Sequence, residues 1–186
     1  TAGTGSEVTN AAVILDKELG QKRLIVENFN IPRLGILDPK MTAKLPKLLT
    51  AGTGMDAMTH AVEALHALPH EPITDGLAMH AIRLLYRYLP TCVENGNDLV
   101  ARGQVQIAAT MAGWAFSIAG IGIVHAMAHS IGAIAHVPHG YANGMLLAEC
   151  MEFNLESCPD AYAMVAEAFG IRERGMDDLD AASTAV

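Results

Sequence analysis

The residues of this sequence best suited to chemistry are histidines gathered in one apolar segment. Four of the eight histidines lie within residues 120–144, namely His125, His129, His136 and His139. No Asp, Glu, Lys or Arg occurs between Arg102 and Glu149. Imidazoles are common metal ligands and titrate near neutrality. Their concentration among small apolar residues therefore predicts a buried site.

An earlier segment, G-M-D-A-M-T-H, supplies a carboxylate. Asp56 and His60 stand four residues apart and would share one face of a helix. A carboxylate combined with several imidazoles suits Fe(II) or Zn(II) better than Ca(II). Closing a four-ligand site with this pair requires two more histidines, which leaves His129 or His136 free for substrate or proton transfer.

Two alternatives compete with a metal site at this segment. Asp56 follows Gly52-Thr53-Gly54, so it would lie near a helix start and could simply cap the helix. Glu63, one turn beyond His60, has the spacing of a substitute ligand but is expected to be a solvated helix residue. A histidine in an apolar helix is also commonly a hydrogen-bonded core residue, although four such rings would each need a partner.

The elements that must position these residues are mostly helices. Short β-branched or aliphatic runs at 11–15, 24–26 and 34–37 predict strands in the first forty residues. From residue 41 onward the helical period predicts helices at 43–50, 55–67, 74–89, 98–119, 121–135, 142–155 and 160–169. The expected fold class is therefore mainly α, with a few strands before an all-helical part.

Composition excludes several functions. The chain has 186 residues, 51% of them hydrophobic, and a formal net charge of -8. Nucleic-acid and anionic-membrane binding are not expected, because both require positive potential. The apolar run at 107–124 is diluted by Gly, Ser and Thr, which favours a buried helix over a membrane span. Three scattered cysteines are compatible with a reducing cytoplasm.

Two glycine motifs could bind phosphate. Gly3-Thr4-Gly5-Ser6 offers backbone N–H groups and hydroxyls that could surround a phosphate. The stretch 52–57 matches the pattern G-x-G-x-x-A, but no convincing strand precedes it, as a dinucleotide fingerprint would require. The first motif is therefore the stronger candidate.

Three ordered motifs resemble the iron-containing (group III) alcohol dehydrogenases. They are T-A-G-T-G-S-E-V-T at 1–9, G-M-D-A-M-T-H-A-V-E-A at 54–64, and G-I-V-H-A-M-A-H-S-I-G at 122–132 followed by V-P-H-G-Y-A-N at 137–143. The resemblance implies residues 1–41 as the remnant of an α/β dinucleotide-binding domain, and 42–186 as a helical, dehydroquinate-synthase-like metal domain. It also implies that an upstream half and the end of the helical domain are absent.

The resemblance further implies specific site residues. The metal ligands fall on Asp56, His60, His125 and His139. His129 matches a histidine near nicotinamide and substrate, a candidate proton relay, while Thr1, Thr4 and Lys22 match positions that contact the cofactor.

The implied activity is metal-dependent interconversion of a small primary alcohol or diol and its aldehyde, by hydride transfer with NAD or NADP. The expected ion is Fe(II), with Zn(II) as the alternative, and the expected assembly is a cytoplasmic homo-oligomer. A zinc-dependent relative resembling glycerol dehydrogenase and a catalytically silent metal-binding fragment are the alternatives.

Overall fold

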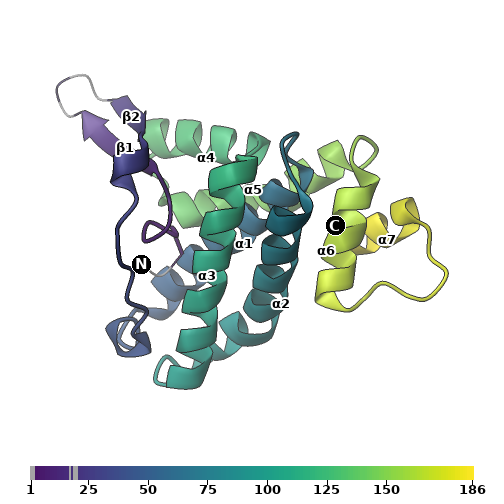
Figure 1. Ribbon diagram of the computed structural model, residues 1–186, viewed down its shortest axis with the longest axis horizontal. Helices are drawn as coiled ribbons and strands as arrows, with labels where there is room; N and C mark the ends of the chain where they lie inside the picture. The colour runs from purple at the N-terminus through teal and green to yellow at the C-terminus, as the bar shows by residue number, and fades with distance from the viewer. Residues whose placement is uncertain (1–2, 17, 19–20) are drawn as a thin grey trace.

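The computed structural model describes residues 3–16, 18 and 21–186, without the side chains of residues 15, 21 and 22. Within that part of the chain, a two-stranded hairpin precedes seven α-helices (Figure 1). The expectation of a mainly α fold is confirmed. The elements are β1 (Ala11–Asp16), β2 (Gln21–Val26), two 3-10 helices η1 (Asn28–Asn30) and η2 (Pro39–Met41), α1 (Lys47–His66), α2 (Pro72–Glu94), α3 (Leu99–Ala119), α4 (Ile123–Ile134), α5 (His139–Asn154), α6 (Pro159–Phe169) and α7 (Asp178–Ala185).

The hairpin confirms two of the three predicted strands. β1 pairs antiparallel with β2, so that Val13 faces Leu24 across the ladder. The third prediction, a strand at 34–37, is wrong, because these residues have no regular structure and pair with no described strand. A β-branched run forms a strand only where a neighbour takes up its backbone hydrogen bonds.

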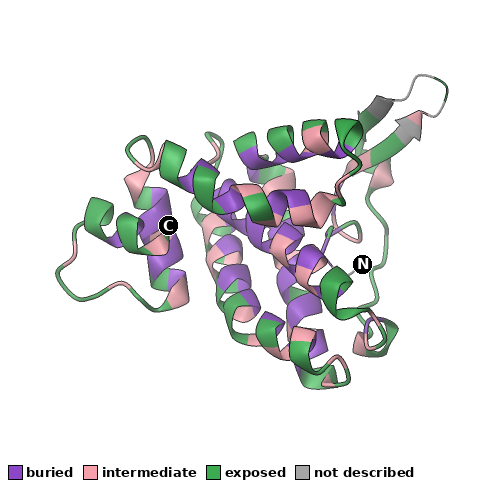
Figure 2. Cartoon of the chain, turned by 180° about the vertical axis from the view of Figure 1, so that it is seen from behind, coloured by how far each residue is buried: buried purple, intermediate pink, exposed green. Residues whose placement is uncertain are grey.

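Helix α1 is the centre of the helical assembly. It packs against α2, α3, α5 and α6, and every residue from 56 to 65 is buried (Figure 2). A helix at the surface needs apolar residues on one face only, whereas a helix that is surrounded by others, such as α1, is buried on all sides. Polar side chains on α1 are consequently held away from water.

The prediction of two helices at 43–50 and 55–67 is wrong, since α1 runs unbroken through Gly52 and Gly54. Glycine inside a helix costs about 1 kcal/mol relative to alanine, but here it permits close packing. A Cβ at Gly54 would lie 2.3 Å from a methyl carbon of Leu89 on α2. Asp56 therefore lies well inside a helix, which rules out the alternative that it only caps a helix start.

Two other helices differ from prediction near proline residues. Helix α2 continues through Pro90 to Glu94 instead of ending at residue 89. Pro90 lies in the last turns, where the missing N–H costs one backbone hydrogen bond without disrupting the helix centre. Helix α5 begins at His139, directly after Pro138, and not at residue 142. His139 thereby gains a helical position with a fixed direction.

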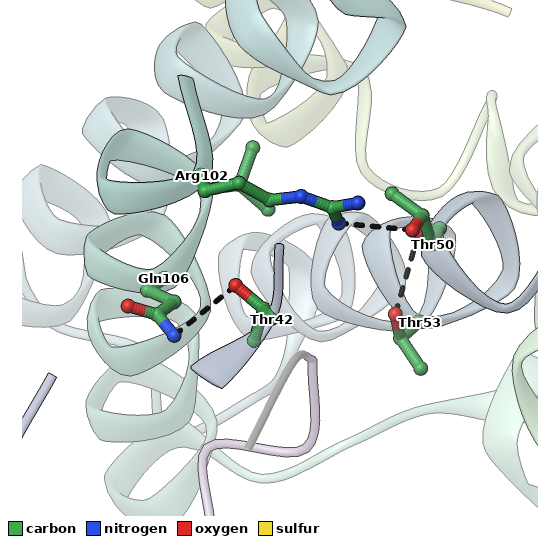
Figure 3. Close-up of a pocket in the computed structure, with 6 residues that line it drawn as sticks. Thr42, Thr50, Thr53, Arg102 and Gln106 are labelled. Carbon is green, nitrogen blue, oxygen red and sulfur yellow. Dashed lines mark hydrogen bonds between the residues drawn. The ribbon is translucent and has the colours of Figure 1, made fainter. Parts of the chain in front are cut away.

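A buried polar network attaches the first turn of α1 and the segment before it to α3 (Figure 3). The Arg102 guanidinium donates to the Thr50 hydroxyl at 2.9 Å and to the carbonyl of Gly96 at 3.0 Å. One turn further along α3, the Gln106 amide donates to the Asp38 carbonyl at 3.1 Å and lies 3.4 Å from the Thr42 hydroxyl. These bonds fix the start of α1 relative to α3.

The apolar run at 107–124 does not form one continuous helix. Helix α3 ends before Gly120, where φ is +93°, and α4 follows at an angle of 104° to α3. No single described helix has the length and apolarity to cross a membrane; only this bent pair meets those criteria together.

The contact between α1 and α5 depends on a glycine. A Cβ at Gly140 would lie 2.2 Å from the carbonyl oxygen of Gly52. We expect Gly140→Ala to lower the free energy of unfolding by about 1–3 kcal/mol, because backbone atoms must move apart. Gly76→Ala on α2 is the control, since nothing lies within 4 Å of its added methyl group. Urea unfolding should show Gly76→Ala unchanged or stabilised, and equal behaviour of the two variants would contradict the packing argument.

Candidate metal centre

Three helices bring a carboxylate and three imidazoles together. Asp56 and His60 project from one face of α1, His125 from the first turn of α4, and His139 from the first turn of α5. Asp56, His60 and His125 are buried, whereas the His139 side chain is 31% exposed. The group therefore has a dry side toward α1 and an accessible side at α5.

Distances within the group are those of ligands around a common point. One ligand atom from each of Asp56, His60 and His125 lies within 4.8 Å of the others. The Asp56 Oδ1 atom is 4.0 Å from His60 Nε2, 3.6 Å from His125 Nε2 and 3.3 Å from His139 Nε2. All three imidazoles thus direct the same type of nitrogen toward one carboxylate oxygen.

Asn143, one turn beyond His139 on α5, places its amide nitrogen among these atoms. Asn143 Nδ2 lies 2.7 Å from Asp56 Oδ1, 3.1 Å from His125 Nε2 and 3.3 Å from His139 Nε2. The Asn143 amide therefore lies where the Asp56 carboxylate and the imidazole nitrogens converge.

Ionisation in the site follows from burial and from the neighbouring charges. Burial lowers the pKa of His60 to about 3, so that its ring is neutral and its nitrogens can act as ligands. Burial works against a charged His125 too, but the hydrogen bonds to Asp56 and Glu63 outweigh it and raise its pKa to about 9. A site that stabilises a positive ring beside Asp56 is also suited to a cation.

The donor set fits a divalent transition metal. One carboxylate and several imidazoles, mostly buried and partly open on one side, match the ligands that Fe(II) and Zn(II) take in proteins. The structural observation that supports this fit is that one ligand atom from each of the buried residues Asp56, His60 and His125 lies within 4.8 Å of the others.

Glu63 is not the solvated residue that its sequence position suggested. Its side chain is fully buried, and its carboxylate accepts a hydrogen bond from His125 Nδ1 at 2.5 Å. Burial alone would raise the pKa of Glu63, but the His125 contact and the backbone N–H donors bring it below its usual value. The expectation was wrong because α1 is covered by other helices on the face where Glu63 lies.

The two remaining histidines of the 120–144 segment behave differently. The His129 ring stacks on His139 with centroids 4.9 Å apart and lies 6.1 Å from that of His125. His136 is exposed in the loop between α4 and α5, with φ of +55°. The structure therefore separates the two candidates that the sequence left open, and His129 is the one beside the site.

The residues expected to contact a cofactor are only partly described. Thr1 lies outside the described residues, and of Lys22 only the backbone, within β2, is described. Thr4 is exposed in a loop that packs on α1 and α3. Gly5, at φ +60°, allows that packing, because a Cβ there would lie 2.6 Å from the Gly113 Cα on α3. Phosphate binding at residues 3–6 stays a prediction.

Comparison with known proteins identifies the family. Residues 50–186 match the model of the C-terminal part of the Fe-containing alcohol dehydrogenase family. The chain belongs to the iron-containing alcohol dehydrogenases. The resemblance inferred from its three motifs is confirmed.

Individual relatives agree with this family. The probable alcohol dehydrogenase EutG of Escherichia coli (strain K12) is 47% identical over 97% of this chain and 45% of its own length. An NAD-dependent methanol dehydrogenase of Bacillus methanolicus is 39% identical over the whole chain and 49% of its own length. A crystal structure of 1,3-propanediol oxidoreductase superposes on this chain with a TM-score of 0.95 and 45% identity. The match covers the whole of this chain and 48% of the oxidoreductase chain. This iron-containing alcohol dehydrogenase chain thus spans about half the length of the relatives it matches.

Sequence reasoning missed two side chains that this chain places in the site, and it noted the spacing of a third, Glu63, but expected it to be solvated. Asn143 shares a face of α5 with His139, so helical spacing was the available signal for it. Phe116 stacks on His60 with ring centroids 4.2 Å apart, and it lies on α3, far away in sequence. No spacing rule could have found that contact.

The lowered pKa of His60 predicts acid sensitivity of the metal-free chain. Its ring is neutral when folded but takes a proton near pH 6.5 when unfolded, so stability falls as pH drops below 6.5 toward 3. Between pH 7 and pH 5 the loss through this group should be about 2 kcal/mol. Urea unfolding in EDTA measures it, and His60→Gln should lose that much less over the same interval. An identical pH dependence in the variant would exclude this role for His60.

Proposed function

We propose that this chain provides the metal-binding half of an alcohol dehydrogenase that interconverts a small primary alcohol or diol and its aldehyde, with NAD or NADP as hydride carrier. The observation that carries the proposal is the convergence of Asp56, His60, His125 and His139 around one point. These four residues would hold the ion, with Fe(II) expected from the family and Zn(II) as the alternative.

The relatives support the class of substrate. Their names include methanol and 1,3-propanediol, both small primary alcohols. The methanol dehydrogenase is also described as NAD-dependent, in keeping with a nicotinamide cofactor for this chain.

A divalent ion bound here would act as a Lewis acid toward the alcohol oxygen, favouring its deprotonation before hydride transfer. The chain's own contribution is geometric and electrostatic. The buried carboxylate of Asp56 and the neutral ring of His60 keep the inner side dry and negatively charged, which concentrates the electrostatic effect of a cation. The partly exposed His139 marks the side from which a substrate could approach.

His129 is proposed to transfer the alcohol proton toward solvent. Its ring is half-buried and stacks on the His139 ring at the accessible side of the group. Histidine is the side chain that most often serves as a general acid or base in enzymes.

Several further assignments belong to the same proposal. We infer that residues 1–41 are part of a dinucleotide-binding domain and that 42–186 form the catalytic helical domain. We also infer that Thr1, Thr4 and Lys22 contact the cofactor, and that the enzyme is a cytoplasmic homo-oligomer. Neither nucleic acid nor membrane is an expected partner.

Removing a ligand tests the metal site. His125→Ala and His139→Ala should each lower the affinity for Fe(II) or Zn(II) by more than about 100-fold, because losing a direct ligand costs more than losing its hydrogen-bond partner. Elemental analysis after anaerobic loading with each metal in turn gives the stoichiometry, and NADH formation from small alcohols by the complete enzyme that contains this chain gives the turnover. His80→Ala on the exposed face of α2 is the control. Stoichiometric metal together with full turnover in both site variants would remove the assignment.

The relay role of His129 has a separate test. In the complete enzyme, His129→Ala should lower kcat by about 100-fold or more, the usual contribution of general acid–base catalysis, and should change the pH dependence of kcat. Metal content should be unchanged. His136→Ala, in the exposed loop, should match the wild type in both measurements. If kcat and its pH profile were unaltered in His129→Ala, the relay would be excluded while the metal site stood.

A further inference from the structure

We propose that Glu63 is a positioning residue for the metal site, whose carboxylate fixes the ring orientation and tautomer of His125. The inference rests on the proposed function, because His125 is taken there as a ligand. It extends that proposal by giving a role to a buried carboxylate that binds neither metal nor substrate.

The two oxygens of Glu63 have separate partners. Oε2 accepts from His125 Nδ1 at 2.5 Å, and Oε1 accepts from the backbone N–H groups of Val124 and His125 at 2.7 and 3.3 Å. Glu63 on α1 therefore holds both the start of α4 and the first functional side chain on it. Gly122 makes this approach possible, since a Cβ there would lie 3.0 Å from Glu63 Oε1.

The contact determines which ring nitrogen of His125 is available. A carboxylate can only accept hydrogen bonds, so Nδ1 must carry a hydrogen to bond Glu63. In the neutral ring the lone pair is then on Nε2, the atom 3.6 Å from Asp56 Oδ1. Hydrogen bonds of this kind fix the tautomer of ligating histidines and increase their basicity.

The same geometry excludes Glu63 as a ligand. Its oxygens are held by Nδ1 and by the N-terminus of α4, whereas the other ring nitrogen of His125 lies near Asp56 Oδ1 and the Asn143 amide. Glu63 still contributes charge. With Asp56 it provides two buried negative charges near a divalent ion, so that a site with neutral imidazoles would carry no net charge.

Glu63→Gln separates this role from helix capping. The amide keeps the size of the side chain and one oxygen, which can still accept from the Val124 and His125 N–H groups. Its NH₂ group then faces Nδ1, which can accept this bond only after giving up its hydrogen. The neutral ring would carry the hydrogen on Nε2, where it blocks metal binding.

The experiment compares Zn(II) affinity of the wild-type chain, Glu63→Gln and Glu152→Gln by competition with a chelating dye. Glu152 is exposed on α5, so its variant controls for the loss of one negative charge. We expect Glu63→Gln to bind 10- to 100-fold more weakly and Glu152→Gln to match the wild type. In the metal-free chains, ¹⁵N NMR of the histidine side chains should show His125 protonated at Nδ1 in the wild type and no longer so in Glu63→Gln.

The outcomes distinguish this inference from the proposed function. A wild-type chain that takes up no metal would overturn both. Metal binding in the wild type with equal affinity and an unchanged His125 tautomer in Glu63→Gln would overturn the role of Glu63 alone. If Glu63→Gln proves unfolded by circular dichroism, Glu63→Asp serves instead, because its carboxylate is withdrawn by one methylene group. A folded Glu63→Asp with weakened zinc binding would support the inference, and one with wild-type affinity would refute it.

Discussion

The arrangement depends on placing negative charge inside the helical core. Asp56 and Glu63 are both buried on α1, and an uncompensated buried carboxylate is costly. Each is compensated by groups from other helices, Asp56 by His125, His139 and Asn143, and Glu63 by the start of α4. The polar site therefore stabilises the relative positions of α1, α4 and α5, in addition to any chemistry it performs.

Small residues make that convergence possible. Gly140 on α5 approaches the backbone of α1 at Gly52, and Gly5 in the N-terminal loop approaches Gly113 on α3. Side chains at these points would hold the segments apart. Without such close contacts the nitrogen of His139 could not approach Asp56 Oδ1 to 3.3 Å. The geometry of the site therefore depends on this close packing of the backbone.

Errors in the sequence-based predictions have a common cause. The sequence predicted a helix break at Gly52 and Gly54 and a solvated side chain at Glu63, because rules based on local sequence ignore the other helices that pack around a segment. In the folded chain, α1 is surrounded by other helices, which reverses both expectations. The strand expected at 34–37 fails for the complementary reason that no described strand pairs with it.

The sequence by itself determined the family, the predominance of helix and the ligand candidates on α1, because short sequence motifs and i, i+4 spacing are local properties. Residue spacing did not distinguish His129 from His136 as the imidazole beside the site, although the family resemblance pointed to His129, and it gave no position to Asn143. Only the tertiary structure decided those points and turned Glu63 toward His125 Nδ1. Such contacts join residues about 10 to 90 positions apart, so they exist only once helix packing has fixed where each side chain points.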